Sequence, residues 1–314
     1  MKLDNRIILI LIVAIGIYAI FLFISDYNII SEKISNFKIG YLPLILFLVT
    51  ASWCPVFIKW HFLLKNCDVN ISLRKNITVF LSGLAFEITP GKFGALMKSQ
   101  ILKTNSNIPR TKTAPIVLVE KVYDLIGAIL ASIIGIMVLG MDTYLIIIAI
   151  LFLAMIFLFM YYKPASELFF KRITKTKFFS KYVENISESY QIIQKSTNVK
   201  IATICILLAV TYWFIISAAV YYTLIGFDIN VLDYLKVLSI YATSILLGVI
   251  SFIPAGIGIT EGTLTGLLTL EGIEISIALV LSVMIRILTL WYSVGVGFIA
   301  LKFTGAFSSR EDFS

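Results

Sequence analysis

The fold of this chain is decided by two short stretches, GLAFEITPGKFG at residues 83–94 and GVISFIPAGIG at residues 248–258. Each stretch puts proline and glycine inside an apolar segment, where proline removes a backbone donor and glycine weakens a helix. Both contain the spacing P-x-x-x-G, and the two prolines, Pro90 and Pro254, lie 164 residues apart. We therefore expect two helix breaks at equivalent places of an internal repeat.

The composition around these breaks is that of a membrane protein. Of 314 residues, 59% are apolar and 14% are charged, and the mean hydropathy is +0.97. A soluble domain of this size would need more polar residues on its surface. A helix crosses the hydrocarbon core in about 20 residues. Uncharged runs of that length occur at residues 7–25, 39–58, 143–162, 201–227 and 237–260, and charge-bearing runs at 113–139 and 276–301. We expect an all-α polytopic membrane protein.

The distribution of charge predicts how the chain crosses the membrane. Basic residues gather at residues 59–112 and 163–200, whereas acidic residues dominate residues 228–233 and 261–274. Because basic loops stay in the cytoplasm, we expect both termini and both basic segments on the cytoplasmic side of the plasma membrane. About six spans then cross the membrane, and each break belongs to a helix pair that enters and turns back. The whole chain, residues 1–314, forms one integral membrane domain.

Apolar spans flank the two breaks at the same offset, which defines one repeat at about residues 39–139 and a second at about residues 203–303. The first broken pair enters from the cytoplasm and the second from outside. Inverted repeats with discontinuous helices are the plan of many secondary transporters. The segment 163–200 mixes aromatic residues with lysine, and we expect it to be an amphipathic element on the anionic inner leaflet.

Two features point to an anion-binding site. A helix that begins after a glycine-rich turn presents backbone N–H groups and a partial positive charge, which favour phosphate or carboxylate. Charged side chains in the middle of a membrane helix cost about 2.5–3.5 kcal/mol each, so they face partners or a wet cavity. Glu87 is a weaker candidate of this kind. The expected substrate-binding residues are Pro90, Gly91, Lys92, Gly94, Lys98, Glu120, Lys121, Asp124, Pro254, Gly256, Gly258, Glu261 and Arg286.

The charged candidates have two interpretations. In one, Arg286 forms a structural ion pair with Glu120 or Asp124. In the other, Lys121 and Arg286 hold an anionic headgroup, while the acids relay protons or balance its charge. The glycines also have two interpretations, since they either admit a headgroup or allow tight helix packing. Both interpretations place the charges in the protein interior.

Cofactors, metals and nucleic acid are not expected. Cys54, Cys67, Cys205 and the single histidine, His61, have no metal-binding spacing. The net charge of +8 comes from basic loops between spans, which is the pattern of a membrane protein. Membrane lipids are the expected partners, and the sequence leaves open a homo-oligomer or a complex with a lipid-synthesis enzyme.

The quoted breaks belong to longer stretches that carry a family resemblance. PGKFGALMKSQILK, PIVLVEKVYDLIGAIL and IPAGIGITEG, followed by an Arg-bearing last helix, resemble the lysylphosphatidylglycerol synthase transmembrane family. This family includes the flippase-like domain of the multiple peptide resistance factor. The resemblance covers about residues 10–303 and implies that the candidate residues form a site for a phospholipid or isoprenoid-phosphate headgroup. Ala95 is a departure, because such motifs often have an acidic residue there. The family's aminoacyl transfer belongs to a separate soluble domain, so no catalytic residue is implied.

The expected function is that of a lipid flippase or transporter for an anionic headgroup, and not that of an enzyme. One alternative is an intramembrane transferase acting on polyprenyl phosphate. Metal-assisted transfer depends on clustered oxygen ligands, and the sequence has no DxD-like motif. The other alternative is a non-catalytic partner of a lipid or glycan pathway.

Overall fold

The computed structural model describes residues 35–138 and 186–304, with isolated positions and short runs between 144 and 155. Every regular element in these ranges is a helix, as expected for an all-α protein. Three of the sequence predictions lie wholly or mostly outside the described residues: the spans at 7–25 and 143–162, and the basic segment 163–200.

The first half of the described chain contains a long helix, two short helices around a break, and a second long helix. These are α3 (Leu42–Asn66), preceded by a 3₁₀ turn (Ile39–Tyr41), then α4 (Leu73–Leu84), the 3₁₀ segment η2 (Pro90–Leu96), α5 (Met97–Ser106) and α6 (Arg110–Val138).

The second half repeats this order after α10 (Ile186–Ser196). It contains α11 (Val199–Gly226), α12 (Tyr234–Ile250), the 3₁₀ turn η3 (Pro254–Gly256), α13 (Ile259–Leu270), α14 (Ile275–Arg286), the π-helical turn η4 (Ile287–Trp291) and α15 (Tyr292–Lys302).

The chain leaves the helical conformation at both places where the sequence predicts a break. In η2, Gly91 and Lys92 have φ values of 57° and 58°. In η3, Ala255 and Gly256 have φ values of 56° and 64°. Left-handed backbone is easy for glycine and unfavourable for residues with a Cβ. Lys92 and Ala255 are therefore held in these conformations by the surrounding structure.

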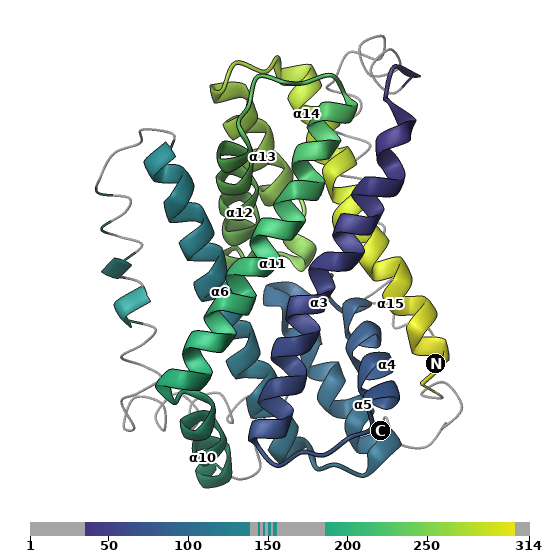
Figure 1. Ribbon diagram of the computed structural model, residues 1–314, viewed down its shortest axis with the longest axis vertical. Helices are drawn as coiled ribbons and strands as arrows, with labels where there is room; N and C mark the ends of the chain where they lie inside the picture. The colour runs from purple at the N-terminus through teal and green to yellow at the C-terminus, as the bar shows by residue number, and fades with distance from the viewer. Residues whose placement is uncertain are drawn as a thin grey trace.

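The two halves are interleaved in space (Figure 1). In that view α4 and α5 lie in the lower half of the molecule, and α12 and α13 lie in the upper half. α3 and α11 pack side by side, α4 packs on α15, and α12 packs on α6. The helix that precedes the break in each half therefore contacts a helix of the other half. The two breaks, η2 and η3, contact each other.

Three helical stretches in the described ranges are long and apolar enough to cross a membrane, namely Ile39–Asn66, Val199–Gly226 and Ile275–Lys302. Together α14, η4 and α15 make the third of them. α6 has 29 residues and carries Glu120, Lys121 and Asp124 in its middle.

The contact between α15 and the end of α4 depends on Gly297. A Cβ at this position would lie 2.8 Å from the carbonyl carbon of Leu84 and 2.8 Å from the Cα of Ala85. Both are backbone atoms, so the helices could not accommodate a side chain without moving apart. Gly295, two residues earlier, has no atom within 4 Å of a built Cβ.

We predict that Gly297→Ala lowers the thermal unfolding temperature of the purified protein in detergent. Forcing a methyl group into a packed contact costs about 1–3 kcal/mol. Gly295→Ala is the matched control, because it makes the same change in an exposed position of the same helix. Its unfolding temperature should stay the same or rise, since alanine favours a helix by up to about 1 kcal/mol over glycine. Equal effects of both changes would contradict the close packing.

Candidate functional site

A cavity of about 90 Å³ lies where the two breaks meet. It is lined by residues from both breaks and from several helices, α3, α6, α11 and α12 among them. Because about 10–15 Å³ of cavity volume is enough for one buried water, the space admits several waters or one compact polar group. Its charged lining residues are Glu87, Lys92, Lys121, Asp124 and Arg286.

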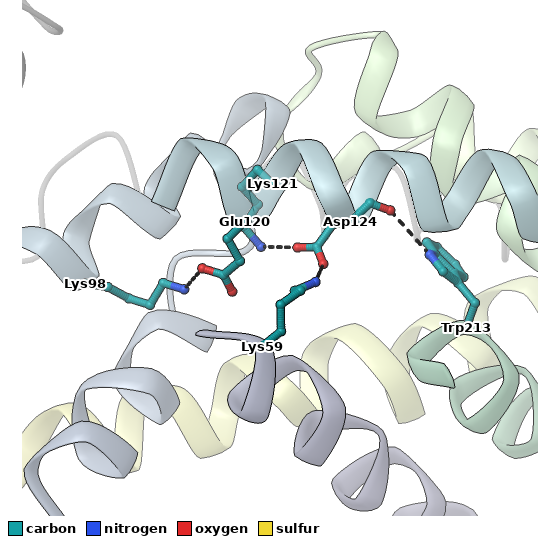
Figure 2. A network of polar contacts seen from close by, with 6 residues as sticks. All are labelled: Lys59, Lys98, Glu120, Lys121, Asp124 and Trp213. Atoms are coloured by element: carbon teal, nitrogen blue, oxygen red, sulfur yellow. Dashed lines mark hydrogen bonds and ion pairs between the residues drawn. The ribbon is translucent and has the colours of Figure 1, made fainter. Parts of the chain in front are cut away.

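Asp124 on α6 is shared by two lysines (Figure 2). Its Oδ2 accepts a hydrogen bond from Lys121 Nζ at 3.0 Å, and its Oδ1 accepts one from Lys59 Nζ on α3. The Lys59 side chain is fully buried, whereas those of Asp124 and Lys121 are 25% and 24% exposed. Trp213 on α11 donates its indole N–H to the backbone oxygen of Asp124 at 3.5 Å. Asp124 thus joins three long helices at the wall of the cavity.

A second ion pair, between Lys98 on α5 and Glu120 on α6, is buried beside the cavity (Figure 2). The ammonium of Lys98 also lies 4.1 Å from the centre of the Trp60 ring, where the negative face of the indole stabilises a cation. The indole N–H of Trp60 donates to Asn76 Oδ1 at 2.9 Å. Neither Lys98 nor Glu120 lines the cavity, so this pair lies outside the cavity wall.

The third ion pair closes the second break. Arg286 Nε donates to Glu261 Oε1 at 2.8 Å, and Arg286 Nη2 donates to the backbone oxygen of Ala255. Glu261 Oε2 accepts the backbone N–H of Gly258 at 2.7 Å, which satisfies a donor at the start of α13. Both charged side chains are at most 3% exposed. The arginine, the carboxylate and the break therefore form one closed ring of polar contacts.

These contacts correct two expectations. Arg286 does not pair with Glu120 or Asp124, because it lies at the end of α14 beside its own break and finds Glu261 there. The N–H group of Gly258 at the start of α13 does not need an external anion, because the carboxylate of Glu261 already accepts its hydrogen bond.

Lys59 is also placed differently from the expectation. The charge pattern put residue 59 at the start of a cytoplasmic segment, but it is a buried residue of helix α3. The signal available in the sequence was a single lysine inside a long apolar run. A charge in that position is expensive in a membrane helix and so indicates a partner.

The sequence-predicted site residues separate into two groups. The cavity is lined by Gly91, Lys92, Lys121, Asp124, Gly256 and Arg286, together with the weaker candidate Glu87. The remaining candidates lie outside its lining: Pro90, Gly94, Lys98, Glu120, Pro254, Gly258 and Glu261. Gly94 serves close packing, since a Cβ there would lie 2.7 Å from the Cβ of Phe86. Its backbone N–H donates to Thr89 Oγ1 at 2.6 Å.

Sequence reasoning missed the aromatic and hydroxyl wall of the cavity. The wall includes Trp53, Tyr212, Trp213, Tyr241, Thr260, Thr289 and Ser293. Aromatic residues recur throughout the apolar helices, and nothing local separates those that face the cavity from those that face lipid. Only the packing of α3, α11 and α12 brings these side chains together.

The charges at the cavity do not cancel. Among the described residues, four cations line the cavity or bind a lining residue, namely Lys59, Lys92, Lys121 and Arg286. Three anions do so, namely Glu87, Asp124 and Glu261. Within the described ranges no carboxylate lies within 4.0 Å of Lys92 Nζ, so this ammonium forms no ion pair there. An unpaired cation in a low-dielectric interior is an attractive site for an anion.

Comparison with known proteins identifies the family of this chain. The family described as the lysylphosphatidylglycerol synthase TM region matches residues 9–297. The chain belongs to this family. A curated protein of Pyrococcus horikoshii, described as a UPF0104 membrane protein, is 25% identical to it over 268 residues. That match covers 76% of this chain and 80% of the relative. The resemblance read from the break motifs is therefore confirmed, and the chain is a membrane protein.

We predict that Asp124→Asn destabilises the protein, because it leaves the buried Lys59 without a carboxylate. Breaking a buried ion pair by removing one partner costs about 3–5 kcal/mol. The double change Lys59→Met/Asp124→Asn should recover most of the lost stability, because methionine removes the buried charge and keeps the apolar stem. Thermal unfolding in detergent measures both.

The control for this prediction is Asp68→Asn, which breaks the exposed ion pair between Asp68 and Lys195. Asp68 raises the pKa of the Lys195 ammonium through a hydrogen bond at 3.0 Å. Water screens such a pair, so the unfolding temperature should not change. A double mutant no more stable than Asp124→Asn would show that the buried charge of Lys59 is not what destabilises the single mutant.

Proposed function

We propose that this protein is a flippase or transporter that moves a lipid with an anionic headgroup, a phospholipid or an isoprenoid phosphate, across the plasma membrane. The observation that carries the proposal is Lys92, a cation with no ion-pair partner in the described part of the chain, at a cavity between two helix breaks. An anionic headgroup in an apolar bundle needs compensating charge. Lys92 provides it at the point where both halves of the bundle meet.

The arrangement of helices supports a transporter plan. Two units with the same order of elements place their broken helices in opposite halves of the molecule (Figure 1). We infer that they form inverted repeats, with one broken pair entering from each side of the membrane and about six full spans around them. Both termini then lie in the cytoplasm, in keeping with the basic loops. Discontinuous helices near the midplane are where secondary transporters bind their substrates.

The size of the cavity limits what enters it. About 90 Å³ accepts a phosphate group and a few waters, and the acyl or isoprenoid chains would remain in the surrounding bilayer. The carboxylates at the site neutralise most of the cationic charge. The resulting small positive excess suits a singly charged headgroup.

We predict that Lys92→Gln slows the movement of an anionic lipid between leaflets about tenfold or more, because a hydrogen bond to a charged group contributes about 1.5–3 kcal/mol. Purified protein is reconstituted into liposomes with fluorescent phosphatidylglycerol, and the fraction accessible to a membrane-impermeant quencher is followed over time. Fluorescent phosphatidylcholine, whose headgroup has no net charge, tests charge selectivity.

Lys65→Gln is the matched control, since it removes the same charge from an exposed position in the last turn of α3. It should transport like the unchanged protein. Equal transport by Lys92→Gln and wild type would exclude Lys92 as the headgroup cation. A wild-type protein that moves no lipid, yet co-purifies with a lipid-synthesis enzyme, would favour a non-catalytic partner instead.

A further inference from the structure

Three cations line the cavity in the described part of the chain, and they differ in how firmly they are held. Lys92 has no ion-pair partner among the described residues. Arg286 is locked, because its partner Glu261 is fully buried and also bound to the backbone of Gly258. Among the described residues, Lys121 and Asp124 form the one ion pair in which both side chains line the cavity. A ligand can therefore reach this pair directly.

Asp124 can release Lys121 without becoming an uncompensated charge. Its other oxygen, Oδ1, is bound by Lys59, whose side chain is fully buried and cannot follow a ligand. The large penalty for breaking a buried ion pair arises from the charge that is left alone. Here the carboxylate keeps Lys59, and the ammonium of Lys121 would gain the ligand's phosphate. The exchange therefore conserves the number of charge pairs.

Lys121 is suited to such an exchange. A lysine ammonium is a point charge on a flexible stem, and it can move between acceptors without a fixed geometry. Lys121 and Asp124 lie three residues apart on one helix, so they remain neighbours whether or not a ligand is present. Asp124 can therefore form the ion pair with Lys121 again when the ligand leaves.

We propose that Asp124 is a release residue, which competes with the anionic headgroup for Lys121 and so limits its affinity and speeds its departure. This inference rests on the proposed function, since it assigns a step of transport to the same cavity. Asp124 is a positioning residue, because it acts on the ligand through Lys121. The pair of Arg286 and Glu261 does not offer the same exchange. Glu261 also accepts the backbone N–H of Gly258, and Arg286 also donates to the backbone oxygen of Ala255.

The proposal separates affinity from transport rate. Removal of the competing charge should tighten binding of the anion and slow its release, whereas a purely structural role would weaken both. Asp124→Asn alone is unsuitable, because it leaves Lys59 buried and unpaired. The comparison is therefore between Lys59→Met and Lys59→Met/Asp124→Asn, which differ only in the carboxylate that competes for Lys121.

The experiment measures binding by titration calorimetry on purified protein in detergent, with short-chain phosphatidylglycerol and, separately, inorganic phosphate as probes. The double variant should bind the lipid about fivefold tighter or more than Lys59→Met, within the usual range of coupling between sites. In liposomes it should move fluorescent phosphatidylglycerol more slowly by a similar factor. Adding Lys121→Gln should abolish the gain in affinity, because the released cation is then absent.

The outcomes are distinct. Unchanged or weaker binding in the double variant would overturn the competition, and so would tighter binding that persists without Lys121. If the wild-type protein moves no lipid, the proposed function fails, while phosphate binding still tests the exchange. Tighter phosphate binding in the double variant would then support it for a free anion. Absence of binding of either probe to every variant would overturn it.

Discussion

A charge inside an apolar bundle is costly without a partner, and this constraint organises the centre of the protein. Asp124 holds Lys59 of α3 and Lys121 of its own helix, and Glu120 holds Lys98 of α5. Each of these charges would be costly alone at low dielectric. Their pairing fixes α6 against α3 and α5, and it sets the positions of Lys59, Lys98 and Lys121.

Backbone groups obey the same constraint at the two breaks. A helix that stops inside a membrane protein leaves N–H and C=O groups that water cannot reach. In the first break the hydroxyl of Thr89 accepts the N–H of Gly94. In the second, Glu261 accepts the N–H of Gly258 while Arg286 donates to the oxygen of Ala255. Side chains thus replace the missing helical hydrogen bonds, and this allows the chain to turn in the interior.

The breaks and the ion pairs meet in one place. η2 and η3 contact each other, and the cavity between them is walled by α3, α6, α11 and α12. Because the helix before each break packs on a helix of the other half, the site belongs to neither half alone. The proposed binding of an anionic headgroup rests on its small positive excess, centred on Lys92. Membership in the lysylphosphatidylglycerol synthase TM family is in keeping with a role at membrane lipids.

The sequence by itself determined the helical membrane class, the places of both breaks, the common order of the flanking helices and the family. These features depend on hydropathy and on the backbone preferences of proline and glycine, which act over short distances along the chain. It also supplied most of the charged residues of the site, because charges are rare in apolar helices and stand out. The tertiary structure alone decided their partners. Lys59 pairs with Asp124, which lies 65 residues away in the sequence. Arg286 pairs with Glu261 and not with the acidic residues of α6. Ion pairing depends on which helix faces meet, and that choice is made by packing between distant segments.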